Sequence, residues 1–176
     1  MDSSSPEVIL RPATPEDIPG ILSLLEEFVQ RQVVLARNPE EMRENYRNFL
    51  VAEDAQGVMI GVGALRPHGA RLYEIRSLAV CSAWQGKGIG RLLVEGLLKK
   101  SRGLSPEGNA CVFTLTKTPD FFRRLGFQEE PKEHFPEKIW ADCRQCPKLR
   151  CCDEIALRYA GAISSQQRNE ELGMRN

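Results

Sequence analysis

The sequence predicts a single mixed α/β domain in which helices pack around one sheet. At 176 residues and 19.8 kDa, the chain is long enough to bury a sizeable hydrophobic core. Segments with strand alternation and segments with helical spacing follow one another along the chain, and no internal repeat is visible. We therefore expect a domain over residues 7–160, a flexible N-terminus over 1–6 and a polar, disordered tail over 161–176.

The first part of the chain reads as a strand followed by two helices. Val8–Arg11 alternates apolar and polar residues, and we expect Arg11, near the start of the sheet, to be structural. Thr14 can cap a helix that begins at Pro15 and runs to about Gln30. The same start signal recurs at 38–39 and predicts a second, short helix that carries Phe49.

Most of the remaining elements are strands. Leu50–Glu53 and Val58–Leu65 are joined by Asp54–Gly57, whose residues are typical of a hairpin. The later expected elements are a strand at 71–80, a helix at 88–100, a strand at 111–116, a short helix at 119–125 ending at Gly126, and strands at 127–129 and 154–159.

Composition and charge exclude several classes of partner. Lysine plus arginine equals aspartate plus glutamate at 24 each, so there is no basic excess of the kind that nucleic-acid binding favours. No apolar run approaches membrane-spanning length. Met1–Pro6 lacks the apolar core of a secretory signal, and we therefore expect a cytoplasmic protein with reduced thiols.

The segment after the 71–80 strand is the most informative. A glycine-rich loop leads into a helix there, so uncovered N–H groups and the positive helix end form a candidate pyrophosphate site. The candidate residues are Gln85, Gly86, Lys87, Gly88, Ile89, Gly90 and Arg91. A plain turn without a ligand is the alternative interpretation, and the spacing fits neither the dinucleotide fingerprint nor a Walker motif.

This loop resembles the acetyl-CoA motif of the GNAT superfamily of N-acetyltransferases. Gln85, Gly88 and Gly90 occupy the motif positions, and the order of elements matches that fold from about residue 8 to 159. The resemblance implies a mixed, mostly antiparallel sheet of six to seven strands with about four helices, and a splay between the fourth and fifth strands. It also implies acetyl-CoA as donor and a possible homodimer. The backbone expected to pair with the pantetheine arm belongs to Leu78, Ala79 and Val80.

Glu74 is the candidate base, because an attacking amine must lose its proton before it can react. On a regular strand it shares a face with Arg76 and Leu78. The alternative is a surface glutamate paired with Arg71 or Arg76. Many GNAT enzymes place a tyrosine as proton donor in the short helix at 119–125, and Phe122 stands at that position here.

A closer resemblance is to the short, kinase-less form of N-acetylglutamate synthase. The matching stretches are 73–80, 114–118, 121–127, the distinctive run Phe-Pro-Glu-Lys-Ile-Trp-Ala-Asp-Cys at 135–143, and the shorter pieces 146–148 and 152–154. That family acetylates the α-amine of L-glutamate in the first step of arginine biosynthesis. The resemblance therefore implies a small-molecule acceptor with two carboxylates.

Two carboxylates require fixed cations, preferably arginine. The candidate substrate-binding residues are Arg37, Arg76, Ser77, Lys117 and Lys138. Lys117 departs from the arginine common in the longer synthases, and Lys138 also replaces a basic residue, so the two-pronged contact of arginine is lost at both. Each cation has an alternative interpretation as a solvated surface charge.

Four of the six cysteines lie close together between Cys143 and Cys152, whereas Cys81 and Cys111 lie in apolar segments. Cys143, Cys146 and Cys152 could hold structural zinc, with His134 as a further ligand. A redox pair, a coincidence or a packed loop that closes over the substrate site are alternatives. We therefore assign no metal ligand.

Three interpretations of function remain open besides glutamate acetylation. The chain could acetylate another small-molecule or protein amine. It could be a non-catalytic acetyl-CoA sensor, because the glycine-rich loop serves binding and catalysis alike. A zinc-dependent interaction domain depends on the cysteines alone.

Overall fold

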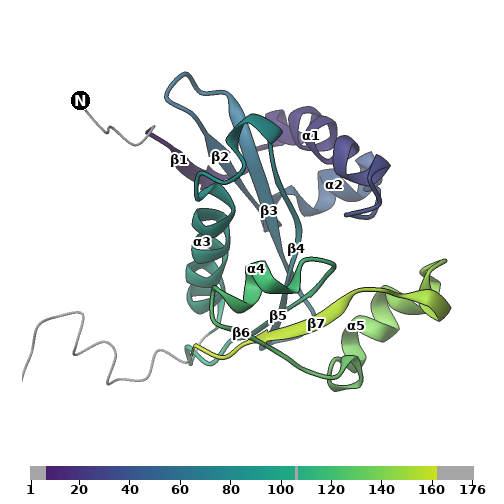
Figure 1. The fold of residues 1–176 in the computed structure, drawn as a ribbon. Coiled ribbons are helices and arrows are strands. Elements are labelled where there is room, and N and C mark those ends of the chain that lie inside the picture. Colours follow the sequence, from purple (N-terminus) through teal and green to yellow (C-terminus); the bar gives the residue numbers. More distant parts are fainter. Residues whose placement is uncertain (1–6, 106, 162–176) are drawn as a thin grey trace, which may run out of the picture. The chain divides into compact units, whose positions relative to one another are not determined.

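The computed structural model describes residues 7–105 and 107–161, which belong to two units that divide at Val112 and Phe113. Strands β1–β4 and helices α1–α3 are in the first unit (Figure 1). The segments expected to be flexible, 1–6 and most of the tail, lie outside the described residues. No helix within the described ranges is long and apolar enough to cross a membrane.

Four antiparallel strands form the sheet of the first unit. They are β1 (Ile9–Pro12), β2 (Phe49–Glu53), β3 (Met59–Pro67) and β4 (Leu72–Val80), paired in that order. The predicted hairpin between β2 and β3 is confirmed, since Asp54 donates its N–H to the carbonyl of Val58 at 3.0 Å. The Asp54 carboxylate also accepts the N–H groups of Gln56 and Val58, which fixes the turn.

Helices of the first unit begin where the sequence signals predicted. A single 3-10 turn at Pro15–Asp17 leads into α1 (Ile18–Gln30). The side chain of Asn38 accepts the N–H of Glu40 at the start of α2 (Pro39–Asn45). The expectation that α2 carries Phe49 is wrong, because a 3-10 turn ends the helix and Phe49 opens β2 with 4% of its surface exposed.

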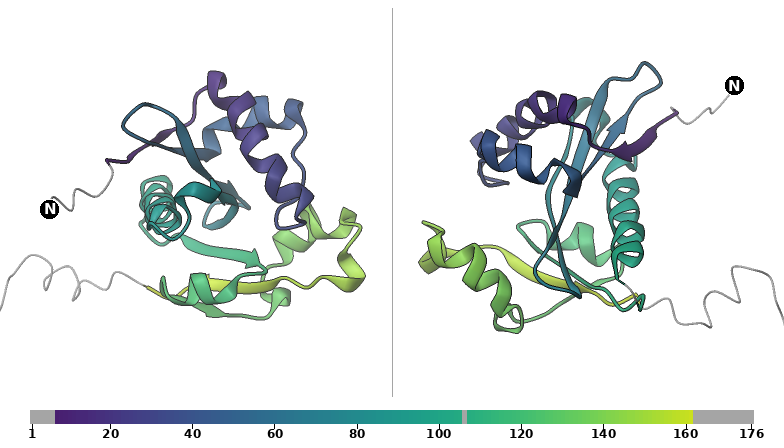
Figure 2. Two further views of the ribbon diagram at one scale, coloured as in Figure 1. Left: turned by 45° about the horizontal axis from the view of Figure 1, so that its top comes forward. Right: turned by 180° about the vertical axis from the view of Figure 1, so that it is seen from behind.

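The two faces of this sheet are covered by different helices (Figure 2). On one face the core residues of α1 and α2 pack against β2, β3 and β4; they include Ile21, Leu25, Phe28, Met42, Phe49, Val51, Val62, Ala64 and Ala79. On the other face lies α3 (Ile89–Leu104), which packs close to the backbone of β3. A Cβ on Gly61 or Gly63 would come within about 3.1 Å of Leu93 or Leu97, so glycine permits this approach.

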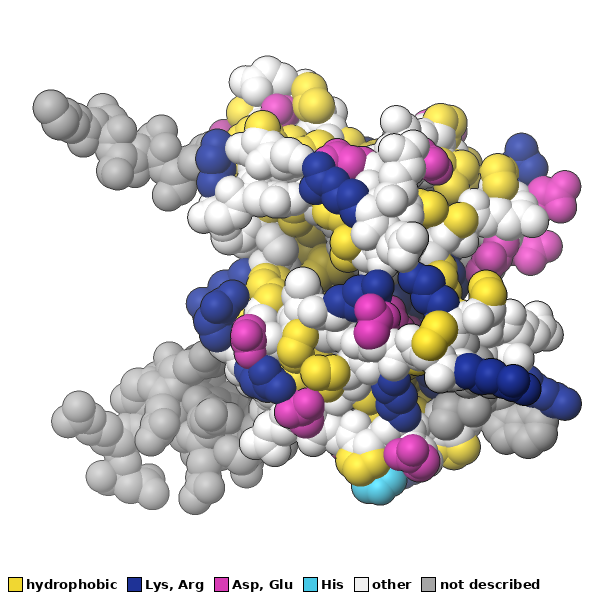
Figure 3. Space-filling view, turned by 45° about the vertical axis from the view of Figure 1, so that its right-hand side comes forward, with side chains coloured by type: hydrophobic (Ala, Val, Ile, Leu, Met, Phe, Trp, Pro, Cys, Tyr) yellow, Lys and Arg dark blue, Asp and Glu magenta, His cyan; other side chains and the backbone are white. Residues whose placement is uncertain are grey.

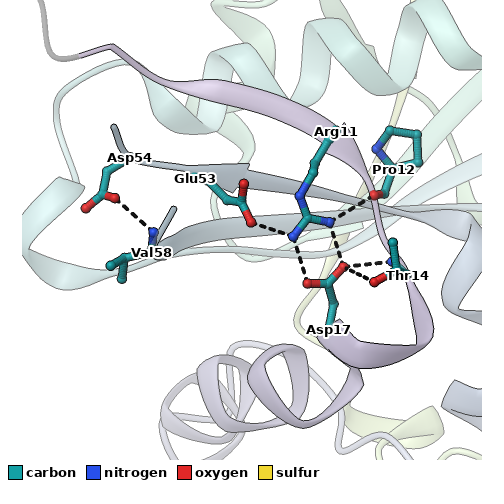
Figure 4. A network of polar contacts seen from close by, with 7 residues as sticks. All are labelled: Arg11, Pro12, Thr14, Asp17, Glu53, Asp54 and Val58. Carbon is teal, nitrogen blue, oxygen red and sulfur yellow. Dashed lines mark hydrogen bonds and ion pairs between the residues drawn. The ribbon is translucent and has the colours of Figure 1, made fainter. Parts of the chain in front are cut away.

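Arg11 joins three segments of the first unit (Figure 4). Its guanidinium donates to both carboxylate oxygens of Asp17, at 2.7 and 2.8 Å, and also to Glu53 of β2. Asp17 in turn accepts the N–H of Thr14 at 2.7 Å. The network agrees with the structural role expected for Arg11.

The second unit contains three antiparallel strands, β5 (Cys111–Thr116), β7 (Ile155–Tyr159) and β6 (Phe127–Glu129). The first two residues of β5 belong to the first unit. The predicted bounds of β5 and β6 are confirmed. Helix α4 (Pro119–Arg123) was expected, whereas α5 (Pro136–Ala141) was not. A helix of six residues is too short to show a helical period, and α5, unlike α4, is not followed by a glycine that marks its end.

Aromatic rings form the interior of the second unit. Phe113 and Phe135 stack with ring centroids 4.3 Å apart. Phe127 packs edge-on against Phe122 at 5.2 Å, and it also contacts Tyr159. Phe122, at the position of the expected tyrosine donor, is 4% exposed and belongs to this interior.

Candidate active site

The loop between β4 and α3 has a backbone that requires glycine and leaves open space around it. Gly86 and Gly88 have φ angles of 74° and 83°, which favour glycine over other residues. A Cβ at either position would meet no atom within 4 Å. Glycine is therefore required at these two positions by the backbone conformation and not by crowding. No described atom of the chain fills the space where their side chains would lie.

Gly88 is also the N-cap of α3, a helix of 16 residues. The helical ladder begins with the N–H of Leu92, which donates to the carbonyl of Gly88 at 3.0 Å. The N–H groups of the first turn precede that ladder and point out of the helix end together with its positive dipole. This donor set fits a pyrophosphate.

Side chains of the loop have contacts within the chain as well. Gln85 donates to the carbonyl of Val80 at 3.0 Å and so closes the loop onto the end of β4. The ammonium of Lys87 lies 4.9 Å from the ring centroid of Trp84, and Arg91 pairs with Glu95 at 2.7 Å. The ligand-binding roles predicted for these residues and for Gly90 and Ile89 stay predictions.

Strand β4 contains a bulge next to the loop. Val62 pairs with Ala79, but Ala64 pairs with Arg76, so β4 has one extra residue between these pairs. Ser77, in the bulge, has a φ angle of 53°, a strained value for a residue with a side chain. Such bulges re-aim side chains beside active sites.

The bulge corrects one expectation about this strand. Glu74 and Arg76 share a face, as predicted from alternation. Leu78 does not share it, because its side chain lies beside Gly63 and Leu97, on the face that α3 covers. The prediction assumed a regular strand, and the extra residue reverses the alternation after Arg76.

Glu74 is buried and hydrogen-bonded to a histidine. Its side chain is 3% exposed, and its carboxylate lies 2.8 Å from the Nε2 of His68, itself 2% exposed. The alternative of a surface glutamate is therefore wrong. Arg71 pairs with Glu107 at 3.0 Å, and Arg76 pairs with Glu41 at 3.3 Å.

A pocket rich in arginine lies in the first unit beside α2, β3 and β4. It encloses about 420 Å³, part of which is open to solvent. The described residues that line it, named here the arginine pocket, are Arg37, Glu41, Met42, Asn45, Asn48, Phe49, Ala64, Arg66 and Arg76. Three arginines and one acid, Glu41, are among these lining residues, and Glu41 pairs with Arg76 at 3.3 Å.

The arginine pocket is next to Glu74 on the sheet. Arg66 is directly opposite Glu74 in the pairing of β3 with β4, and Arg76 follows Glu74 by two residues on the same face. Arg37 donates through Nε to the hydroxyl of Ser77 at 3.1 Å, which ties the segment before α2 to the bulge. Three of the predicted substrate-binding residues, Arg37, Arg76 and Ser77, are thus brought together with the candidate base.

The two predicted lysines belong to the second unit. Lys117 pairs with Asp153 at 3.1 Å and lowers the pKa of that carboxyl. Lys138 is 8% exposed and donates to Asp142, four residues later, at 2.7 Å. Their part in substrate binding stays a prediction, as does the splay between the fourth and fifth strands.

The clustered cysteines are free thiols, and no disulfide joins those at Cys143, Cys146, Cys151 and Cys152. In the part of the chain that is described, no group of three potential ligands that includes a cysteine brings its ligand atoms within 4.8 Å. His134 lies 2.9 Å from Glu130 instead.

Sequence reasoning missed Arg66, Asn45, Asn48 and His68. Arg66 shares a face of β3 with Ala64, two residues earlier, but its place opposite Glu74 depends on the pairing of β3 with β4. His68 follows the last residue of β3, and its contact with Glu74 depends on the same hairpin. The two asparagines depend on how α2 ends, which the sequence signals did not show.

Comparison with known proteins agrees with this geometry. The family model described as an acetyltransferase (GNAT) domain matches residues 45–129. An uncharacterized N-acetyltransferase of Chlorobaculum tepidum is 44% identical over 151 residues, covering 86% of this chain and 95% of the relative. An amino-acid acetyltransferase of Mycobacterium tuberculosis is 37% identical over 123 residues, covering 69% of this chain and 68% of the relative.

A solved structure gives the same result. N-acetylglutamate synthase from Neisseria gonorrhoeae, complexed with coenzyme A and N-acetyl-glutamate, matches with a TM-score of 0.76 and 28% identity. The match covers 86% of this chain and 34% of the Neisseria chain, so the chain spans about a third of that protein. Fold, loop and relatives together define an acyltransferase. The chain belongs to the GNAT family of N-acetyltransferases, as its sequence resemblance predicted.

Proposed function

We propose that this chain transfers the acetyl group of acetyl-CoA to the α-amine of L-glutamate, the first step of arginine biosynthesis. The observation that carries the proposal is the position of the arginine pocket beside Glu74 on β4. Similarity to an amino-acid acetyltransferase and to a synthase solved with N-acetyl-glutamate supports an amino acid as acceptor.

Donor binding is assigned to the β4–α3 loop. The N–H groups at the start of α3 and the open space beside Gly86 and Gly88 suit the pyrophosphate of coenzyme A. Lys87 and Arg91 are exposed cations at the same end of the helix. The Neisseria relative was solved with coenzyme A, which supports the same donor here.

Acceptor binding is assigned to the arginine pocket. Arginine pairs with carboxylates through two parallel hydrogen bonds, and a dicarboxylate needs at least two such cations. Arg37, Arg66 and Arg76 supply three from three separate segments. A polyamine acceptor would instead need an acidic pocket, which the lining residues do not provide.

Glu74 is assigned the role of base. As the amine nitrogen bonds to the acetyl carbon, the carbon–sulfur bond breaks, sulfur leaves as a thiolate and Glu74 takes the amine proton. The hydrogen bond from His68 holds the carboxylate in one orientation within a buried site. Phe122 offers no proton to the sulfur, so the thiolate leaves without help from that position.

A turnover assay tests the proposal. Thiol release is followed with acetyl-CoA and a panel that contains L-glutamate, L-glutamine, L-aspartate and simple amines. The highest kcat/KM is expected with L-glutamate. Glu74→Gln should lower kcat by about 10²–10⁴-fold while acetyl-CoA still binds.

The matched control is Glu107→Gln, which removes an exposed carboxylate of the same unit. It should leave turnover unchanged. Higher kcat/KM with another amine would overturn the glutamate assignment, and full activity of Glu74→Gln would overturn the role of the base.

A further inference from the structure

Asn48 lies at the wall of the arginine pocket, where a turn leads into a strand. It is the last residue of the 3-10 turn Tyr46–Asn48 and directly precedes Phe49, which opens β2. Phe49 pairs with Ala64 of β3, and both of these residues also line the pocket. The pairing of β2 with β3 therefore holds Asn48 beside the pocket.

The backbone on both sides of Asn48 is held by hydrogen bonds. The N–H of Phe49 donates to the carbonyl of Tyr46 and closes the turn. The carbonyl of Arg47 accepts a hydrogen bond from the partly buried ammonium of Lys100 in α3. Neither contact uses the side chain of Asn48. The fold thus fixes the position of this residue and leaves its amide out of the fixing contacts, as a preorganised binding group requires.

The two asparagines of the arginine pocket differ in how their amides are used. Nδ2 of Asn45 donates to the carbonyl of Glu41, one turn earlier in α2, at 2.9 Å. The amide of Asn48 makes no hydrogen bond with any residue that the structure describes, although Asn48 is partly buried. An amide offers two donors and an acceptor, and such groups normally have a partner when they are buried. The space that Asn48 lines is the pocket, so a bound molecule is in a position to be that partner.

We propose that Asn48 binds the acceptor, its Nδ2 donating a hydrogen bond to a carboxylate oxygen of the amino acid. The proposal rests on the function proposed above and adds a residue to its acceptor site. A carboxylate has about four lone-pair sites, so an amide can donate to it beside an arginine. The amide is neutral, and its contact is therefore less sensitive to salt than an ion pair.

Aspartate at position 48 tests which end of the amide is used. An amino acid also offers an amine N–H, which the Oδ1 of Asn48 could accept. Asn48→Asp keeps an accepting oxygen and replaces the donor by a second oxygen that shares a negative charge. Because like charges repel, this variant should weaken a carboxylate ligand more than simple loss of the amide does.

Asn48→Leu and Asn48→Asp are compared with the natural protein, and Asn109→Leu is the matched control. Leucine is close to asparagine in size and has no hydrogen-bonding group in its side chain. Asn109 is an exposed asparagine of the same unit that does not line the pocket. Calorimetry measures the dissociation constants of N-acetyl-L-glutamate and of coenzyme A, and thermal unfolding measures the melting temperature of each protein.

Asn48→Leu should weaken binding of N-acetyl-L-glutamate about 5–20-fold, because one hydrogen bond to a charged group is lost at a partly exposed position. Asn48→Asp should weaken it by at least about 50-fold, because repulsion is added to that loss. Binding of coenzyme A should change by less than about twofold in both variants, since a separate segment holds it. The melting temperature should hardly change, and Asn109→Leu should leave both dissociation constants unchanged.

Three results would contradict the role of Asn48. Unchanged affinity of Asn48→Leu for N-acetyl-L-glutamate, or no detectable binding of that ligand by the natural protein, would overturn the contact with the acceptor. Binding by Asn48→Asp that equals or exceeds binding by Asn48→Leu would overturn donation from Nδ2 to a carboxylate. Weaker binding of both ligands together with a lower melting temperature would show that Asn48 supports the fold instead.

Failure of the proposed function gives a different result, in which the turnover panel prefers another acceptor to L-glutamate. If that acceptor is an amino acid, its N-acetyl derivative becomes the calorimetric probe, because every amino acid carries an α-carboxylate. The glutamate assignment then fails, and the Asn48 variants still decide the role of Asn48. A preference for a simple amine without a carboxylate would overturn both proposals.

Discussion

Arg11 and Arg76 are both strand arginines of the first unit, and both are ion-paired, yet Arg76 lines a pocket and Arg11 joins segments of the fold. Arg11 meets two carboxylates, those of Asp17 and Glu53, on neighbouring segments. Arg76 pairs with Glu41, and two further arginines, Arg37 and Arg66, line the same pocket. Arg11 thus lies between two acids, whereas Arg76 is one of three arginines that line a pocket.

The difference separates a structural ion pair from a ligand site. An arginine that the chain itself surrounds with acids has its charge compensated, and its hydrogen bonds fix the geometry of the fold. Arginines that line a pocket together can instead bind the carboxylates of a ligand. Over the face drawn in Figure 3, by contrast, basic and acidic side chains of the described residues are interspersed.

Among the arginines, the largest effect is expected from Arg66 in the arginine pocket. Arg66→Gln removes one cation opposite Glu74 and should raise the KM for L-glutamate about 10–100-fold, because a charge-assisted contact is lost. The melting temperature should hardly change. Steady-state kinetics and thermal unfolding of the same preparations measure both quantities.

The control is Arg43→Gln, which removes an exposed arginine of α2 that does not line the pocket. Its KM should equal that of the natural protein. If Arg66→Gln lowers the melting temperature and leaves KM unchanged, Arg66 is structural like Arg11, and the comparison fails.

Local signals in the sequence were sufficient for most of the fold. Thr14, Asn38 and the Asp54–Gly57 turn each specify a helix start or hairpin through contacts within a few residues. The positive φ angles of Gly86 and Gly88 likewise depend on the loop itself. Features that depend on short-range contacts can be read from one sequence.

Features that depend on the pairing of distant segments could not be predicted from the sequence. The bulge at Ser77 follows from how β4 aligns with β3, and it reversed the face predicted for Leu78. Arg66 joined the site for the same reason, through its register with Glu74. His68, directly after β3, contacts Glu74 across the hairpin that β3 forms with β4.

A smaller effect, on stability instead of activity, is expected at Arg11. Arg11→Gln breaks the contacts with Asp17 and Glu53 and should destabilise the fold by about 1–2 kcal/mol, discounted because the side chain is 31% exposed. That corresponds to a fall of roughly 2–8 °C in melting temperature, measured by calorimetry. The KM for L-glutamate should not change.

Arg31→Gln is the matched control, because it removes an arginine whose pair with Glu27 is exposed on both sides. Such a pair contributes only about 0.3–0.5 kcal/mol. If both variants lose the same small amount of unfolding free energy, the ion pairs of Arg11 do not stabilise the contact between strand and turn, and the comparison fails.

The smallest effect is a pH dependence that arises from the same network. The hydrogen bond from Arg11 lowers the pKa of Asp17 from 3.8 to about 2. Because the folded pKa is depressed, this stabilisation is fully present above about pH 4 and is lost as the pH falls towards 2. Urea unfolding measures the effect. The free energy of unfolding of the natural protein should exceed that of Asp17→Asn by about 1 kcal/mol at pH 5, after allowance for screening, and this difference should disappear between pH 4 and pH 2. A gap that persists unchanged at pH 2 would show that Asp17 acts through the shape of its turn, with Thr14, and not through its charge on Arg11.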